Sequence, residues 1–137
     1  MQATKPPSPP MFASDLIRQC LLGATALVFF ILAIRTWLVP AKVAEELGYQ
    51  LTGANGHSEL FAIYVGLWLA SGAMAAVAAV HIQQPLLGDW VALLVLGQPL
   101  GRLLAIPRFG LPSGPLLGFF ALEIIGGLAL LAVRPTG

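Results

Sequence analysis

The sequence has few charged residues and almost no cysteine. Only 9% of its 137 residues are charged, whereas soluble domains carry about 25%. The formal net charge is +1, without the basic stripe that a nucleic-acid surface needs. The single cysteine, Cys20, excludes an internal disulfide and a cysteine-rich metal site. These scarcities exclude an ordinary soluble domain and predict no nucleic-acid partner.

Motifs for a metal, a bound phosphate or a catalytic nucleophile are also missing. His57 and His81 lie in or beside predicted loops, and neither has a second ligand at a useful spacing. No nucleophile and base occur in a recognisable pattern. We therefore predict no metal, no cofactor and no catalytic residue, and an enzyme is the least favoured class.

Long apolar runs are what the sequence does contain. The run from Leu60 to Val80 has no charge, and 58% of all residues are hydrophobic. A bilayer core needs about 20 apolar residues in one helix, and three further runs of similar length surround this one. We predict an all-α integral membrane protein, an up-down-up-down four-helix bundle that contacts the lipid bilayer. The expected helices cover about residues 16–39, 59–80, 86–106 and 115–133.

The predicted organisation is a proline-rich arm, residues 1–14, followed by a single four-helix transmembrane domain, residues 15–137. The first run is followed by Arg35 and Thr36 rather than by a small-residue cleavage site, so we expect a retained helix and not a signal peptide. Arg18 and Arg35 are expected to reach the headgroups from the two ends of this helix. After Pro40 we expect a short polar helix, 41–47, and then a loop, 49–58.

An even number of helices puts both termini on one side of the membrane. Cations near the two sides number four against three, so the positive-inside rule favours neither orientation.

The same geometry gathers five polar residues in one half of the bilayer. They are Glu59, Tyr64, Gln98, Arg102 and Glu123. Tyr64 is about 7 Å deeper than Glu59 at 1.5 Å per residue, and Gln98 and Arg102 share a helix face because they are four residues apart. Asp89 belongs to the opposite surface. We predict a polar cluster within the bundle.

Glu123 is the most informative member of this cluster. An ionised acid near the middle of a membrane costs about 2.5–3.5 kcal/mol on insertion scales. We therefore expect its carboxylate to face the bundle and to lie within reach of Arg102, Tyr64 or Glu59. Two interpretations stay open: a clamp between the last two helices, and the polar floor of a ligand cavity or a titratable site.

Small residues predict where helices approach closely. Such residues let backbones pack in lipid, where no hydrophobic effect drives helices together. On the second predicted helix they are Gly66, Ala70 and Gly72, and on the third Gly97 and Gly101. We predict that these five positions form packing faces.

Several of these residues also carry a resemblance to a family of small bacterial four-helix membrane proteins of unknown function, DUF4345. Its second helix begins with Asn/Ser-Glu-x-Arg-x-x-Tyr-Gly-Gly, and Gly-Arg, an Asp-Gly-x-Pro turn and an embedded Glu follow. The matching residues here are Ser58, Glu59, Tyr64, Gly66, Gly101, Arg102, Gly110, Pro112 and Glu123. Phe61 replaces the family's Arg and Phe109 its Asp. The resemblance covers about residues 16–134 and implies the fold and a bacterial inner membrane, with no activity.

Two functions from different classes remain. The small size, the small-residue faces and the proline-rich arm favour an accessory or structural subunit, with other membrane-protein subunits or further copies of this chain as partners. The polar cluster around Glu123 and Arg102 favours a binder or carrier of a lipophilic small molecule. The first is the preferred prediction from the sequence.

Overall fold

The computed structural model describes residues 12–134. That part of the chain is helical and contains no strand. The elements are α1 (Phe12–Leu38), α2 (Pro40–Glu46), α3 (Gly53–Phe61), the π-helix η1 (Ala62–Leu67), α4 (Trp68–Val80), α5 (Pro85–Phe109) and α6 (Pro115–Ala132). Since α3, η1 and α4 follow one another without a break, four helices are long and apolar enough to cross a membrane. The predicted all-α, four-helix membrane fold is confirmed.

Helix ends differ from the predictions at three places. α1 begins at Phe12, inside the predicted arm, and residues 1–11 of that arm lie outside the described residues. The predicted loop over 49–58 is wrong from Gly53 onward, because Gly53 turns the chain into a helix with a φ of 61° that favours glycine. α5 passes through Pro107 and ends only at Phe109, where it is followed by Gly110 with a φ of 81°.

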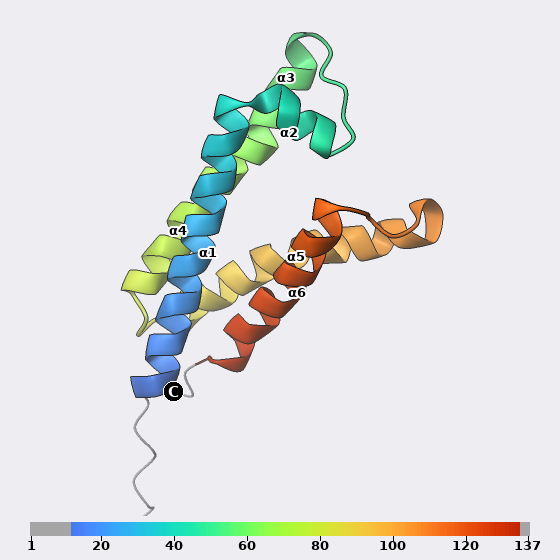
Figure 1. The fold of residues 1–137 in the computed structure, drawn as a ribbon. Coiled ribbons are helices and arrows are strands. Elements are labelled where there is room, and N and C mark those ends of the chain that lie inside the picture. Colours follow the sequence, from blue (N-terminus) through green and yellow to red (C-terminus); the bar gives the residue numbers. More distant parts are fainter. Residues whose placement is uncertain (1–11, 135–137) are drawn as a thin grey trace, which may run out of the picture.

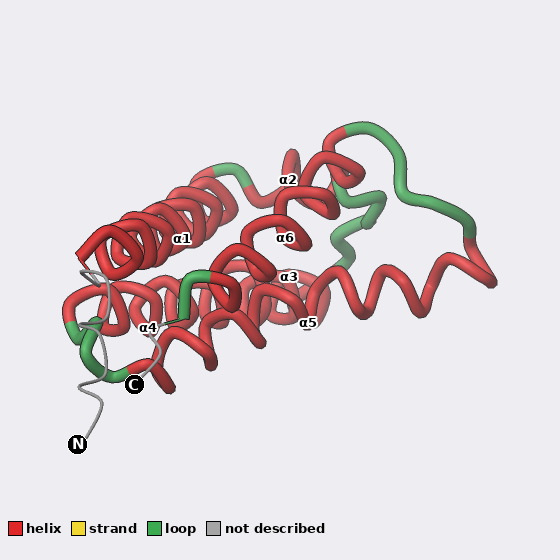
Figure 2. Tube along the Cα trace, turned by 90° about the horizontal axis from the view of Figure 1, so that it is seen from below, coloured by secondary structure: helices red, strands yellow, loops and turns green. Residues whose placement is uncertain are grey.

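The long helices form two hairpins. α1 packs against the continuous helix made of η1 and α4, and α5 packs against α6. The hairpins meet at one end and diverge toward the other, as Figure 1 shows. The meeting end, called the apex below, holds the turn after α4, the first turns of α1 and the end of α6 (Figure 2).

The apolar core lies in the half of the bundle nearest the apex. All four long helices contribute to it, with Leu22, Ala26 and Phe29 from α1, Ala75 and Ala78 from α4, Val91, Ala92 and Val95 from α5, and Leu130 from α6. Many large apolar side chains elsewhere on these helices are exposed, which suits contact with lipid. The two hairpins are therefore packed together only in the half of the bundle nearest the apex.

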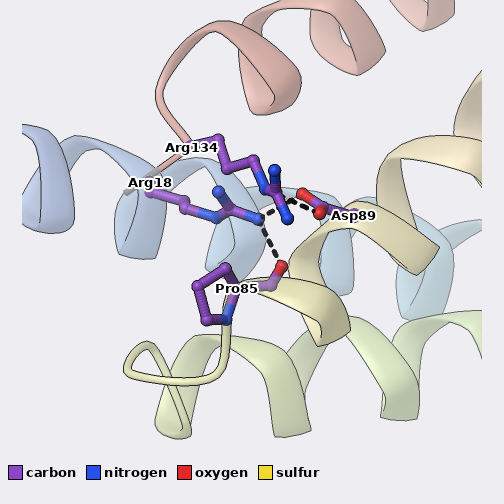
Figure 3. Close-up of polar contacts among 4 residues, drawn as sticks. All are labelled: Arg18, Pro85, Asp89 and Arg134. Carbon is purple, nitrogen blue, oxygen red and sulfur yellow. Dashed lines mark hydrogen bonds and ion pairs between the residues drawn. The ribbon is translucent and has the colours of Figure 1, made fainter. Parts of the chain in front are cut away.

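Arg18 is buried at the apex and joins the hairpins. Its side chain is 1% exposed, and its Nη2 donates to the carbonyl oxygen of Pro85 at 2.8 Å and to Oδ1 of Asp89 at 3.0 Å. Figure 3 shows the guanidinium between these groups. The prediction that Arg18 reaches the headgroups is wrong. The start of α5 offers a carboxylate and a carbonyl at this depth, and together they compensate a buried cation.

Arg134 completes the apex from the chain that follows α6. Its Nε lies 2.8 Å from Oδ2 of Asp89. Each oxygen of this carboxylate therefore forms an ion pair with a different arginine (Figure 3). Asp89 thus links α1, α5 and the end of α6. The first turns of α1 and the end of α6 lie together as a result.

Gly88 makes the burial of Arg18 possible. A Cβ at this position would lie 2.4 Å from Nη2 of Arg18 and 2.8 Å from its Nε. Gly88→Ala should displace the guanidinium from both of its partners and lower the free energy of unfolding by about 1–3 kcal/mol, as overpacking does. Thermal unfolding in detergent, followed by circular dichroism, measures the change.

Gly97→Ala in the same helix is the matched control, because a Cβ there meets no atom within 4 Å. Alanine should leave the stability unchanged or raise it by up to about 1 kcal/mol through helix propensity. Equal melting curves for the two variants would contradict the role of Gly88.

Candidate functional site

The open half of the bundle forms a cleft between the two hairpins, with a volume of about 630 Å³. Its walls come from α1, α2, η1, α4, α5 and α6. Most of the lining is apolar, including Leu21, Val28, Phe29, Leu32, Leu67, Leu94, Val95, Phe119 and Leu122. The polar side chains that reach it are Thr25, Arg35, Thr36, Glu46, Tyr49, Tyr64, Ser71, Gln98, Arg102 and Glu123.

Arg102 and Glu123 form the central polar contact of the cleft. Nη1 of Arg102 on α5 donates to Oε2 of Glu123 on α6, and the two groups form an ion pair. The side chains are 26% and 14% exposed. Glu123 is about 12 Å from the start of α6 at 1.5 Å per residue, so the pair lies well inside the span. The carboxylate faces the interior of the protein and not its outer surface.

The structure gathers four of the five residues of the predicted polar cluster. Tyr64 and Gln98 line the cleft with Arg102 and Glu123. Glu59 does not; its side chain is exposed on α3, outside the cleft.

Three aromatic side chains, Tyr49, Tyr64 and Trp68, contact one another in the wall opposite the ion pair. The hydroxyls of Tyr49 and Tyr64 are 3.4 Å apart, and the rings of Tyr64 and Trp68 meet edge to face with centroids 4.9 Å apart. Tyr64 belongs to the π-helix η1. Wide turns of this kind inside α-helices occur frequently at functional sites. The sequence predicted Tyr64 but missed Tyr49, which a positive φ at Gly48 brings back from α2 toward the cleft.

Three hydroxyls in the lining are already committed to their own helices. Thr25, Thr36 and Ser71 each donate to the carbonyl oxygen four residues earlier, at distances between 2.8 and 2.9 Å. Their protons are unavailable to a ligand, so they offer acceptors only. Among the charged and amide side chains of the lining, the donors therefore come from the level of Arg102 and from the mouth.

A second ion pair lies at the mouth of the cleft. Nη2 of Arg35 donates to both carboxylate oxygens of Glu46, at 2.6 and 2.8 Å. This hydrogen bond lowers the pKa of Glu46 below its ordinary value, so the pair holds α2 against α1 at neutral pH and is lost as the pH falls through the lowered pKa. The prediction from the sequence placed Arg35 at the headgroups and missed this ion pair. The helix break at Pro40 was the available signal, because it lets α2 fold back toward α1.

The predicted packing residues are in different surroundings. Gly72 is buried, and a Cβ there would lie 3.0 Å from the ring of Phe30. Gly66 and Ala70 are exposed. A Cβ on Gly97 or Gly101 would meet no atom within 4 Å, and Gly101 lines the cleft. Of the five, only Gly72 lies at a close helix contact within the described chain, because the hairpins diverge where Gly97 and Gly101 lie.

Comparison with sequence families identifies the family of this chain. The pattern of DUF4345, described as a domain of unknown function, matches residues 17–133. The chain belongs to the DUF4345 family. No curated protein and no solved structure matches it significantly. Of the two aromatic replacements in this DUF4345 member, Phe109 is 82% exposed and Phe61 is half-buried.

The described residues hold no group of three or more His, Cys, Asp or Glu that could bind a metal ion. What the site can supply is an apolar slot with donors and acceptors part-way along it. Its chemistry suits the binding of an amphiphile.

Removing one partner of the central ion pair should cost more than removing both. Arg102→Ala leaves the Glu123 carboxylate unpaired in a largely apolar cleft, whereas the double change Arg102→Leu with Glu123→Leu replaces the pair by apolar side chains. We expect the single variant to be less stable than the double by about 1–3 kcal/mol, below the value for a fully buried pair because both groups are partly exposed. Chemical denaturation in detergent measures both, and a less stable double variant would contradict the argument.

Proposed function

We propose that this membrane protein binds a lipophilic small molecule in the cleft between its hairpins. The observation that carries the proposal is a cleft of about 630 Å³ with a mostly apolar lining and an internal ion pair. Ligand sites in proteins commonly measure about 300–1,000 Å³ and have this kind of lining, with a few placed polar groups. The proposed role is that of a binder or carrier.

The polar groups support binding because the fold has no evident need of them here. Charged residues inside membrane spans are costly and usually mark functional sites. The helices are held together at the apex by Arg18 and Asp89 and by the apolar core. The pair of Arg102 and Glu123 does link α5 to α6, yet these helices also pack against each other. A ligand site explains why the side chains of Arg102 and Glu123 both face the cleft.

The accessory-subunit role remains a prediction from the sequence, as does the bacterial inner membrane. The proposal of a binder is compatible with a complex, because a cleft can serve a ligand within a larger assembly. Within residues 12–134 the cleft is the feature that favours a specific activity, so we prefer binding to the accessory role.

Trp68 offers a direct test, since it lies within the cleft lining. Trp37 and Trp90 lie outside the lining and are 63% and 54% exposed, so both can be changed to Phe to leave Trp68 as the only tryptophan. The protein in lipid nanodiscs is titrated with medium-chain amphiphiles that carry bromine at the chain end and a neutral, an anionic or a cationic head group. At least one should quench the Trp68 fluorescence saturably.

Two glycines of α5 provide a matched pair for this experiment. Gly101 lines the cleft and Gly97, one turn earlier, does not, and both have open space around the Cβ position. Gly101→Leu should fill the cleft and weaken quenching about tenfold or more, a change of about 1.4 kcal/mol in binding. Gly97→Leu should leave it unchanged. Quenching that never saturates, or that responds equally to both variants, would mean that the probes reach Trp68 from bulk lipid and would overturn the proposal.

A further inference from the structure

We propose that the cleft selects an amphiphile whose head group has no net charge and carries both hydrogen-bond donors and acceptors. This inference rests on the proposed binding function and names the class of ligand. It follows from how the charges in the lining are paired and from which of their atoms are left over.

The charges in the lining cancel. The cations are Arg35 and Arg102, and the anions are Glu46 and Glu123. Each cation forms an ion pair with one of the anions, Arg35 with Glu46 and Arg102 with Glu123. A ligand therefore meets two neutral pairs, and neither sign of charge is in excess.

Each partner of the inner pair still has atoms to offer. The guanidinium of Arg102 has five N–H donors, and its bond to Glu123 engages Nη1. Oε1 of Glu123 accepts no hydrogen bond from another described residue, and the Gln98 amide, which has donors and an acceptor, makes none with another described residue either. Donors and acceptors thus lie together at one level of the cleft. A head group with hydroxyl and carbonyl groups can use both kinds at once.

A charged head group would add a charge to the cleft that has no counter-charge there. An anion on the free donors of Arg102 lies beside the Glu123 carboxylate with no second cation to balance it, and a cation on Oε1 of Glu123 lies beside Arg102 with no second anion. An unpaired charge in such surroundings is strongly unfavourable. A neutral head group adds hydrogen bonds without this penalty, which is the physical basis of the selectivity.

The apolar part of the ligand has its own direction. Toward the apex the lining is formed by side chains such as Leu21, Leu94 and Val95, and its hydroxyls donate to backbone carbonyls. Toward the mouth lie Tyr49 and the outer ion pair. We infer that the tail points to the apex and passes Trp68, with the head near Arg102.

The test compares three probes with the same brominated medium-length chain: a monoglyceride, a sulfonate and a primary ammonium. Binding is measured by quenching of Trp68 in the single-tryptophan protein in nanodiscs. The unchanged cleft should bind the monoglyceride at least about tenfold more tightly than either charged probe, a ratio that corresponds to about 1.4 kcal/mol.

Two substitutions should then change the order of the probes. Glu123→Gln leaves Arg102 without its counter-charge and should make the sulfonate the preferred probe. Arg102→Gln leaves Glu123 alone and should make the ammonium preferred. Glu59→Gln and Arg108→Gln make the same chemical changes at exposed positions outside the cleft and should keep the original order, which controls for long-range charge effects.

A charge reversal guards against variants that fail to fold. Arg102→Glu combined with Glu123→Arg restores a neutral pair and should restore the preference for the monoglyceride, with circular dichroism confirming helical content. A preference of the unchanged protein for a charged probe, or an order that neither substitution alters, would overturn the inference while leaving binding itself intact. If none of the three probes quenches saturably, the proposed function fails and the inference fails with it.

Discussion

The rest of the structure depends on the buried contact of Arg18 with Asp89 and the Pro85 carbonyl. In lipid, apolar surfaces gain nothing from leaving water, so helices associate through packing and polar contacts. Here the polar contact and the apolar core lie at the same end of the bundle. Two hairpins fastened at one end can diverge at the other, and the cleft is the space that this leaves.

Charge compensation is the second rule that the structure follows. In the cleft each charged pair consists of one cation and one anion, and at the apex Arg18 and Arg134 share the carboxylate of Asp89. An isolated charge at such depth is expensive. Pairing meets this requirement, but only the cleft pairs keep donors and acceptors turned toward an open space.

Much of the fold could be predicted from the sequence, because a bilayer sets helix length directly. Depth along each helix also brought Arg102 and Glu123 into one half of the membrane. The burial of Arg18 could not be predicted, since it depends on the missing side chain of Gly88, far away in the sequence. The same holds for the ion pair of Arg35 with Glu46 and for the place of Tyr49, which follow from the path of α2 back toward the cleft. Helix content and depth are local properties, whereas the angle between hairpins is not.

The glycines show how the two halves of the bundle differ. Gly72, Gly88 and Gly127 lie where another side chain is so close that a Cβ would meet it at 3.0 Å or less. Gly101 and Gly126 line the cleft, and a Cβ on either would meet no atom within 4 Å. Close packing explains the first group, but it cannot explain small residues where the helices have moved apart. Larger side chains at Gly101 and Gly126 would fill the cleft, so their absence keeps its volume open.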